Sequence, residues 1–114
     1  MATKILNANT TLSGNQTNLE AGTGFTPKAG LRWTIVELRP YFSGKGDFLG
    51  FVDDQQYHDI ASEDVATYGK PHVVGVIIQQ PVIFHAKFSD RSGVSNFVGV
   101  DIVVEETTIP AGGA

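Results

Sequence analysis

The sequence predicts an all-β protein, and three observations support this class. Apolar and polar residues alternate in several segments, most clearly at Val98, Val100, Ile102 and Val104, and this period of two is typical of a strand with one buried face. Thirteen glycines and five prolines are spread along the chain, which indicates many turns between short strands. Only one stretch favours a helix. The expected architecture is an antiparallel β-sandwich, jelly-roll-like, with seven or eight short strands and at most one short helix.

The clearest strands are in the last third of the chain. Residues 97–105 form a strand with one buried face, and residues 82–88 precede it with the same alternation of apolar and polar positions. The segment 90–93 between them is rich in turn-forming residues. The two strands therefore form either an antiparallel hairpin or a crossing from one sheet to the other.

Three more strands are expected in the middle of the chain. Residues 72–78 are apolar on both faces, which is typical of a strand in the middle of a sandwich or barrel, and Pro81 marks a bend after it. Residues 31–38 form a strand that closes at Pro40, and residues 48–52 form a shorter one.

The remaining segments complete a single domain. Residues 62–68 are the one helix candidate, where Ser62 would cap one or two turns. Residues 1–27 are polar and punctuated by glycine, so they form either edge strands on an existing sheet or an extended arm, and residues 107–114 form a C-terminal tail. The 114 residues have the size of one domain with one core.

Composition excludes several classes of function. The chain has no cysteine, so it has no disulfide, thiolate metal site or cysteine nucleophile. Its net charge is −4 and its eight Lys and Arg residues are scattered, so we expect no direct contact with nucleic acid. No apolar run reaches the ~18 residues of a membrane helix, and the first residues lack the apolar core of a signal peptide, so we expect no membrane insertion.

The most polar segment is the run of residues 53–59. Four of its side chains could gather a hard cation, because carboxylate oxygens suit calcium: Asp53, Asp54, His58 and Asp59. Their spacing does not match an EF-hand loop, and the segment has no glycine for the sharp turn of such a loop. We therefore interpret it as a solvated loop between strands, and we expect no metal and no other cofactor.

The sequence contains no catalytic constellation that we recognise. It has no Gly-x-Ser-x-Gly nucleophile elbow. Paired carboxylates would suit glycosidic chemistry, and acids on or beside strands occur at Glu37, Asp101, Glu105 and Glu106, but most such acids form the wet face of a sheet. We therefore expect that the protein is not an enzyme.

Aromatic residues gather in the middle third of the chain. Trp33 is expected in the core. We interpret a further set of residues as an interface with another protein chain: Tyr41, Phe42, Phe48, Phe51, Tyr57 and His85. His85 alternates with Phe84 and Ala86, so it points away from their face. Two alternatives stay open for the aromatic residues, namely a plug in the core and a platform for a sugar ring.

A small, cysteine-free, mildly acidic, glycine-rich β domain with polar ends resembles the jelly-roll and sandwich proteins of virus particles, such as capsid, turret and decoration subunits. The resemblance covers composition and architecture, and it transfers no functional residue. It implies a structural subunit, made in the host cytoplasm and located in the virion, that assembles with copies of itself and with other structural proteins of the particle. Neighbouring subunits would then hold the polar ends. The alternative is a β-sandwich module that binds a ligand such as a carbohydrate.

Overall fold

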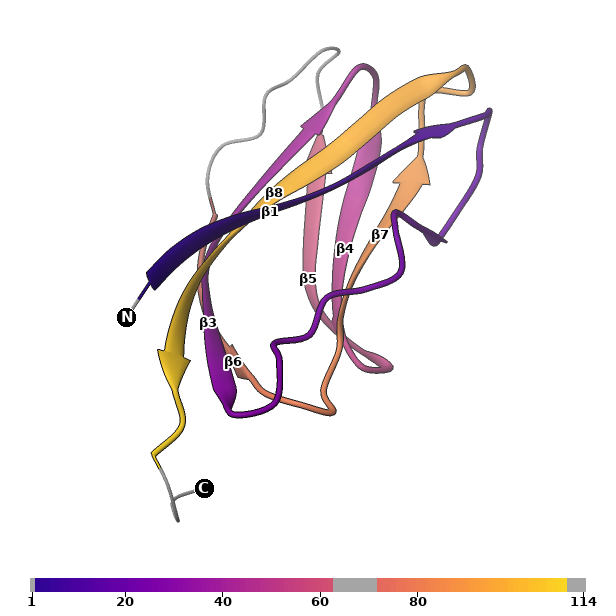
Figure 1. Ribbon diagram of the computed structural model, residues 1–114. Helices are drawn as coiled ribbons and strands as arrows, with labels where there is room; N and C mark the ends of the chain where they lie inside the picture. The colour runs from indigo at the N-terminus through magenta and orange to yellow at the C-terminus, as the bar shows by residue number, and fades with distance from the viewer. Residues whose placement is uncertain (1, 63–71, 111–114) are drawn as a thin grey trace.

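The computed structural model describes residues 2–62 and 72–110, and within these ranges the side chains of residues 57–62 and 72–74 lie outside the description. The described residues form eight strands and no helix, which confirms the all-β prediction (Figure 1). The strands are β1 (Ala2–Leu12), β2 (Leu19–Glu20), β3 (Leu31–Phe42), β4 (Gly46–Val52), β5 (Gln55–Ser62), β6 (His72–Ile78), β7 (Phe84–Asp90) and β8 (Asn96–Thr108).

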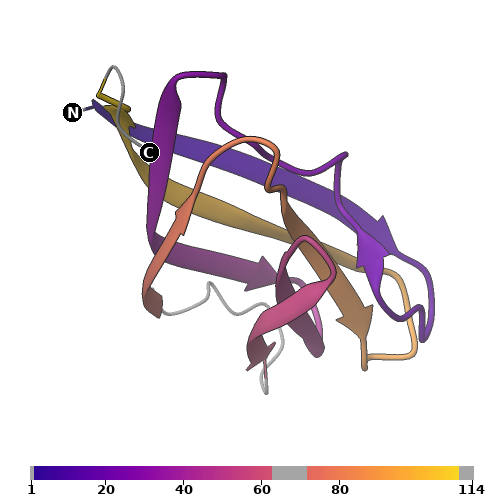
Figure 2. The ribbon, with the colours of Figure 1, turned by 90° about the horizontal axis from the view of Figure 1, so that it is seen from below.

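The strands are arranged in two four-stranded antiparallel sheets. Sheet A has the order β1-β8-β3-β6, and sheet B has the order β2-β7-β4-β5. The first strand thus pairs with the eighth, the second with the seventh, the third with the sixth and the fourth with the fifth. This order results when one long antiparallel hairpin rolls up into two layers, and it is the jelly roll that the sequence predicts. Figure 2 shows β1 and β8 side by side along one side of the molecule.

The core lies between the inner faces of the two sheets. It includes the alternating residues that the sequence predicts for two strands, and each of them is at most 1 % exposed: Val98, Val100, Ile102 and Val104 on β8, and Phe84, Ala86 and Phe88 on β7. Full burial of one of the larger apolar side chains stabilises the fold by roughly 1.5–3 kcal/mol. Because β7 and β8 are in different sheets, the segment 91–95 is a crossing between sheets and not a hairpin turn.

β3 is longer than the sequence predicts, since it continues through Pro40 to Phe42. A proline lacks the N–H that a strand with two partners needs. In the described residues, however, the pairing of β3 with β6 ends where Leu38 lies opposite His72, whereas its pairing with β8 continues to Phe42. Pro40 therefore lies where β3 pairs on one side, and the strand tolerates it there.

β6 lies at an edge of sheet A, so the prediction of a middle strand is wrong. Its inner residue Ile78 is buried and Val76 packs against the core, whereas Ile77 on the outer face is 62 % exposed. The apolar residues on both faces of this strand therefore indicate an uncovered apolar surface and not a strand that is covered on both sides.

The N-terminal residues form edge strands and not a free arm. β1 lies at the other edge of sheet A and pairs with β8 without interruption, from Ala2 opposite Glu106 to Leu12 opposite Asn96. Ala8 and Leu12 are buried in the core. The strand is thus held by its own chain, and its order does not require a neighbouring subunit.

Parts of two predicted segments fall outside the described residues. The predicted C-terminal tail begins as the last part of β8, and Ile109 then donates its N–H to the Gly30 carbonyl at 2.9 Å, but residues 111–114 are outside the description. The predicted helix is outside it after Ser62, which ends β5. Among the described residues, no helix is long and apolar enough to cross a membrane.

Candidate functional site

Two of the aromatic residues predicted for an interface lie in the core. Phe42 on β3 and Phe48 on β4 are 4 % and 0 % exposed. Both contact Phe88 on β7, whose ring centroid is 6.2 Å from that of Phe42 and 5.4 Å from that of Phe48. Both side chains are on the inner faces of their strands. Alternate residues of a strand share a face, so the position of a residue in the strand determines whether it points to the second sheet. The interface prediction is therefore wrong for these two residues, and the alternative of a core plug is correct for them.

Two further predicted residues lie on the outer face of sheet B, where each has a partner in the same chain. His85 points away from the buried face of β7, and its Nδ1 is 2.8 Å from the Glu20 carboxylate. The half-buried Phe51 has the Lys87 ammonium 4.5 Å from the centre of its ring. These contacts are an ion pair, if His85 is protonated, and a cation–π interaction. The side chain of Tyr57 is outside the described residues.

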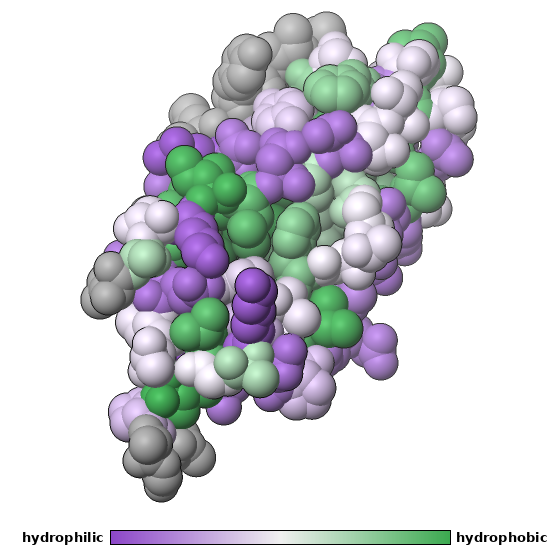
Figure 3. All heavy atoms as spheres, viewed as in Figure 1, coloured by the Kyte–Doolittle hydropathy of each residue, from purple (hydrophilic) through white to green (hydrophobic). Residues whose placement is uncertain are grey.

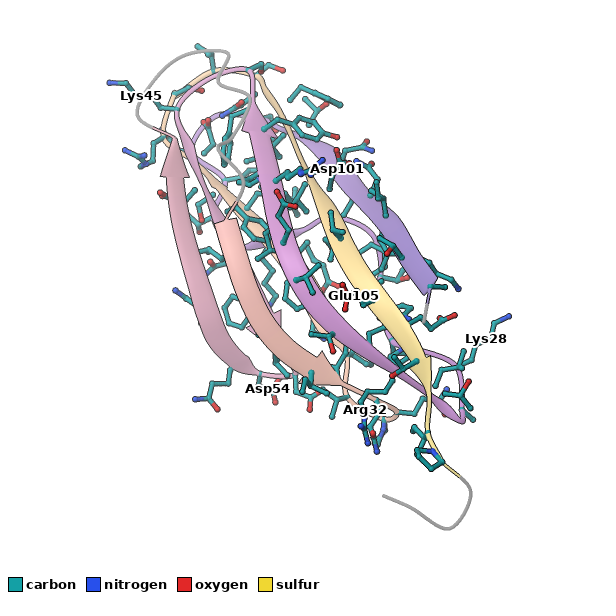
Figure 4. All side chains as sticks on the ribbon, turned by 90° about the vertical axis from the view of Figure 1, so that its left-hand side faces the viewer. Lys28, Arg32, Lys45, Asp54, Asp101 and Glu105 are labelled. Atoms are coloured by element: carbon teal, nitrogen blue, oxygen red, sulfur yellow. The ribbon has the colours of Figure 1, made fainter. Side chains whose placement is uncertain are left out.

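The acidic segment begins with the turn between β4 and β5. Asp53 has a positive φ of 53°, which favours a turn residue of this type. Its N–H donates to the Ile83 carbonyl at 2.8 Å, and its Oδ1 accepts from the Ile83 N–H at 3.0 Å. Asp53 therefore fastens this turn to the segment before β7, and Asp54 next to it is exposed at the rim of the molecule (Figure 4).

The structure does not test the candidate for a cation site in residues 53–59. The side chains of His58 and Asp59 are outside the description. In residues 2–62 and 72–110, as far as side chains are described, no group of three or more His, Cys, Asp or Glu residues is arranged to hold a metal ion.

The outer face of sheet A differs from that of sheet B. The register of the strands places the following residues on it: Ile5, Asn7 and Asn9 of β1, Phe97, Gly99, Asp101, Val103 and Glu105 of β8, Thr34, Glu37, Arg39 and Tyr41 of β3, and Ile77 of β6. We call this set the A face, and Figure 4 shows it with Asp101 and Glu105 on β8. The large hydrophobic residues that are exposed in the described part of the chain are Ile5, Ile77, Val94 and Phe97, and all but Val94 belong to the A face.

An aromatic pair lies at one end of the A face. The Tyr41 ring lies across Gly99 of the neighbouring strand so closely that a Cβ at Gly99 would be 2.3 Å from the ring carbon Cζ. Phe97, two positions before Gly99, is 46 % exposed, and its ring centroid is 6.1 Å from that of Tyr41. Gly99 thus leaves room for the tyrosine ring over its backbone, next to an exposed phenylalanine.

Amide side chains of β1 connect this pair to the middle of the face. Asn7 donates from Nδ2 to the Tyr41 hydroxyl at 3.1 Å and to Asp101 Oδ1 at 2.8 Å. Asn9 in turn donates from Nδ2 to Asn7 Oδ1 at 2.6 Å. The network joins β1, β3 and β8, so it fixes the positions of these polar groups on an otherwise exposed surface.

Two of the acids that the sequence left open for catalysis, Glu37 and Glu106, are held by partners in the same chain. Glu37 accepts from Arg39 Nε at 3.0 Å and from Nη2 at 3.1 Å. Glu106 lies on the opposite side of sheet A, where it accepts from the Trp33 indole at 2.9 Å and from the Lys4 ammonium at 3.0 Å. The hydrogen bond from Trp33, and then that from Lys4, lower the pKa of Glu106 below its ordinary value.

β1 leaves one edge of sheet A open. The strand has 11 residues, and in the described part of the chain no strand pairs with it on the side away from β8. Natural sheets protect such edges with charges, prolines, bulges or very short strands. β1 has no proline, its only charged residue is Lys4, and its register with β8 has no bulge. Figure 3 shows hydrophobic side chains among polar ones on the side of the molecule where β1 lies in front.

One end of the sandwich is organised by a buried carboxylate. Asp90 ends β7, is 4 % exposed, and accepts hydrogen bonds from four residues: Asn15, Ser92, Gly93 and Asn96. Burial alone would raise the pKa of Asp90, but the hydrogen bonds from Ser92, Asn15 and Asn96 outweigh it and lower the pKa far below its ordinary value. Asp90 therefore joins the β1–β2 loop to the crossing between the sheets.

Comparisons with known proteins do not assign the chain to a family: no protein-family model, no curated protein and no solved structure matches it. Its function must therefore be inferred from the site itself. Asn7, Asn9 and Phe97 help to form the A face, although the sequence does not single them out as site residues. The sequence does indicate the position of Phe97, because this residue alternates with the buried valines of β8 and therefore points to the other face of the strand. No sequence pattern places Asn7 and Asn9 next to β3 and β8.

Proposed function

We propose that this chain is a non-enzymatic structural subunit that assembles with further copies of itself, and with other structural proteins, into a larger particle such as a virion. The observation that carries this proposal is the A face, which leaves Ile5, Ile77 and Phe97 exposed at 63, 62 and 46 % on one side of one sheet. These three side chains lie in separate rows of the sheet, with polar groups such as Asn7 and Asp101 between them, and a surface that combines apolar anchors with polar groups around them is typical of a protein–protein interface.

The polar groups of the same surface also support a binding role over a catalytic one. Glu37 is engaged by Arg39, and Asp101 is engaged by Asn7. Such an arrangement fixes these carboxylates as hydrogen-bond acceptors for groups of the same chain, whereas an acid for general catalysis has to reach a group of the substrate. The jelly-roll strand order agrees with that of many particle subunits, but this is an analogy of fold and not of function.

Light scattering coupled to size-exclusion chromatography, followed by electron microscopy of the same sample, tests the proposal. We expect oligomers or particles whose fraction rises with concentration. The substitution Phe97→Ser should shift the sample towards monomer, whereas Thr23→Ser, an exposed change outside both sheets, should leave it unchanged. A protein that stays monomeric over the whole concentration range would contradict self-assembly.

The aromatic pair supports a second candidate function, which is binding of a carbohydrate. Tyr41 and Phe97 form an aromatic surface, and Asn7, Asn9 and Asp101 place amide and carboxylate groups beside it. Sugar rings stack on aromatic faces and form hydrogen bonds with such groups at their rims.

Titration calorimetry with a panel of neutral oligosaccharides tests this second candidate. Binding should be lost in Tyr41→Ala and in Phe97→Ala and kept in Phe51→Ala, whose ring lies on sheet B. A monomer that binds none of the oligosaccharides would contradict both candidates.

A further inference from the structure

We propose that β1 pairs in antiparallel orientation with β1 of a second copy, so that two A sheets join into one continuous sheet around a two-fold axis at Asn7. This inference rests on the proposed self-assembly and adds a second contact to it, at the edge of sheet A beside the A face. Strand addition at an open edge satisfies backbone groups of both partners, and the side chains of the strand determine which partner and which register are favoured.

Of the edges in the described structure, β1 has the fewest obstacles to such pairing. β2, at one edge of sheet B, has 2 residues. β5, at the other edge, contains a bulge, because its register with β4 passes from His58 to Gln56 and leaves Tyr57 unpaired. β6 includes Gly75, which weakens a strand interior. β1 offers 11 residues in regular register, of which about half direct their backbone N–H and C=O groups away from β8.

The only charge on β1 does not protect the edge. Lys4 extends towards β8, where its ammonium is 3.0 Å from the Glu106 carboxylate. An edge lysine opposes strand addition when its charge has to be buried next to the incoming strand. Since Glu106 holds this charge over the neighbouring strand of the same chain, the uncharged residues of β1 face the incoming strand.

Charge and polarity favour antiparallel pairing of the whole strand. A parallel, in-register pair would place Lys4 directly opposite Lys4 of the second copy, and like charges in that position are destabilising. In the antiparallel pair centred on Asn7, Lys4 lies opposite Thr10, and Ile5 lies opposite Asn9. On the inner face, the half-exposed Leu6 lies opposite Ala8, so that its remaining apolar surface becomes covered.

The central residue lies opposite itself in the second copy, which agrees with an isologous two-fold interface. All 11 residues of β1 take part in this register, since Ala2 then lies opposite Leu12. Neither copy has to move its β1–β8 pairing, because the new hydrogen bonds use the side of β1 away from β8.

Single cysteines test the proposal cleanly, because the chain contains no cysteine of its own. Directly opposed residues of antiparallel strands have Cα atoms about 4.5–5.5 Å apart, which a disulfide can span. Under mild oxidation of the assembled protein, Asn7→Cys should therefore form a covalent dimer. In Ile5→Cys the two thiols would be separated by four residues along the strands, about 13 Å, so no dimer should form. Ile77→Cys on β6 is a matched control on the other edge of the same sheet.

A charge-reversal pair tests the same register without oxidation. In the double variant Ile5→Lys, Asn9→Lys, like charges meet twice across the two-fold axis, and the dimer dissociation constant should rise about tenfold. In Ile5→Lys, Asn9→Glu, opposite charges meet twice, and the dissociation constant should stay within about threefold of the unsubstituted protein. All of these positions are exposed, and a circular dichroism spectrum of each variant verifies that it folds.

The outcomes separate the two proposals. A covalent dimer of Asn7→Cys, together with recovery in the Lys–Glu variant, supports β1 pairing. A protein that assembles but crosslinks at Ile77→Cys or Ile5→Cys and not at Asn7→Cys overturns this inference and leaves self-assembly standing. A protein that is monomeric by light scattering, with no covalent dimer at any position, overturns both.

Discussion

The two sheets share a core, but the contacts on their outer faces differ. At the described outer surface of sheet B, Asp47 forms an ion pair with Arg91 of the following segment at 3.1 Å, and the Glu20 carboxylate is 2.8 Å from the His85 ring, which is an ion pair if that ring is protonated. On sheet A, polar groups are also paired with each other, but large apolar side chains between and beside them stay in solvent. The edges differ in the same sense, since sheet B ends in a very short strand and a bulged one, whereas sheet A ends in the long, regular β1.

This difference indicates which surface is suited to another protein. Exposed apolar area and unpaired strand edges gain free energy when they are covered, whereas exposed ion pairs contribute little to binding. In its described side chains, sheet B thus has the surface of a solvated layer, whereas sheet A has the surface that we propose a partner covers. The predictions below change one side of this comparison at a time.

The largest effect on stability is expected for an aromatic residue that the sequence assigns to an interface but that lies in the core. Phe48→Ala should lower the free energy of unfolding by about 3–5 kcal/mol, because it removes a fully buried ring. Phe97→Ala on the A face should lower it by less than about 1 kcal/mol and act on assembly instead. Urea unfolding at a concentration below that of assembly measures both. Equal losses in the two variants would contradict the division into a buried and an exposed aromatic set.

A somewhat smaller effect is expected at the carboxylate that joins the ends of the two sheets. Asp90→Ala should cost about 3 kcal/mol, since it leaves buried donors such as the Asn96 amide without their acceptor. Urea unfolding of this variant, beside Asp54→Ala on an exposed turn, measures the difference. If both substitutions cost less than about 1 kcal/mol, Asp90 does not have the stabilising role assigned to it.

The same carboxylate predicts a pH dependence. The pKa of Asp90 is lower in the folded than in the unfolded protein, so its contribution to stability is complete above its ordinary value of 3.8 and is lost as the pH falls below that value. The free energy of unfolding should therefore fall between about pH 4 and pH 2, and Asp90→Asn should make this fall less steep. A fall of equal steepness in Asp90→Asn would assign it to other groups.

An intermediate effect is expected at the glycine beneath Tyr41. In Gly99→Ala the new Cβ would overlap the tyrosine ring, so the ring must move, at a cost of about 1–2 kcal/mol. The movement should also break the hydrogen bond between Asn7 and Tyr41 and weaken assembly. Gly75→Ala is the matched control, because a Cβ on this glycine of the same sheet meets nothing within 4 Å. A tolerated Gly99→Ala would mean that Tyr41 does not lie as described.

The smallest effect is expected on the outer face of sheet B. His85→Ala removes a surface contact with the Glu20 carboxylate, so the free energy of unfolding should change by less than about 1 kcal/mol and the assembly state should not change. Light scattering of this variant shows which of the two sheets carries the assembly interface. Loss of assembly would place the interface on sheet B, in agreement with the interpretation of His85 from the sequence.

Much of the fold could be predicted from the sequence, because strand periodicity determines which residues are buried. The alternation at Val98 to Val104 and at Phe84 to Phe88 was predicted correctly and is seen in the core. The same alternation does not predict the order of the strands in a sheet, because that order depends on pairing between segments that are distant in the sequence. For this reason β6 was predicted in the middle of the sandwich, although it lies at an edge.

Less of the candidate site could be predicted. The sequence shows that aromatic residues gather between Trp33 and Tyr68, but it does not show which side of a strand faces the second sheet, so Phe42 and Phe48 were assigned to a surface. Asn7 and Asn9 have no pattern of their own. They become part of a site only because the first strand pairs with the last, across more than 90 residues of chain.

Hydrogen–deuterium exchange as a function of protein concentration tests most directly whether copies of the protein join through sheet A, at its β1 edge. We predict that amides of β1, in residues 2–12, gain protection as the concentration rises, since about every second N–H of an edge strand acquires a partner when another strand is added. The amides of β5 at the edge of sheet B should exchange at the same rate at all concentrations. Protection that increases in β5 and not in β1, or that does not depend on concentration, would contradict the account.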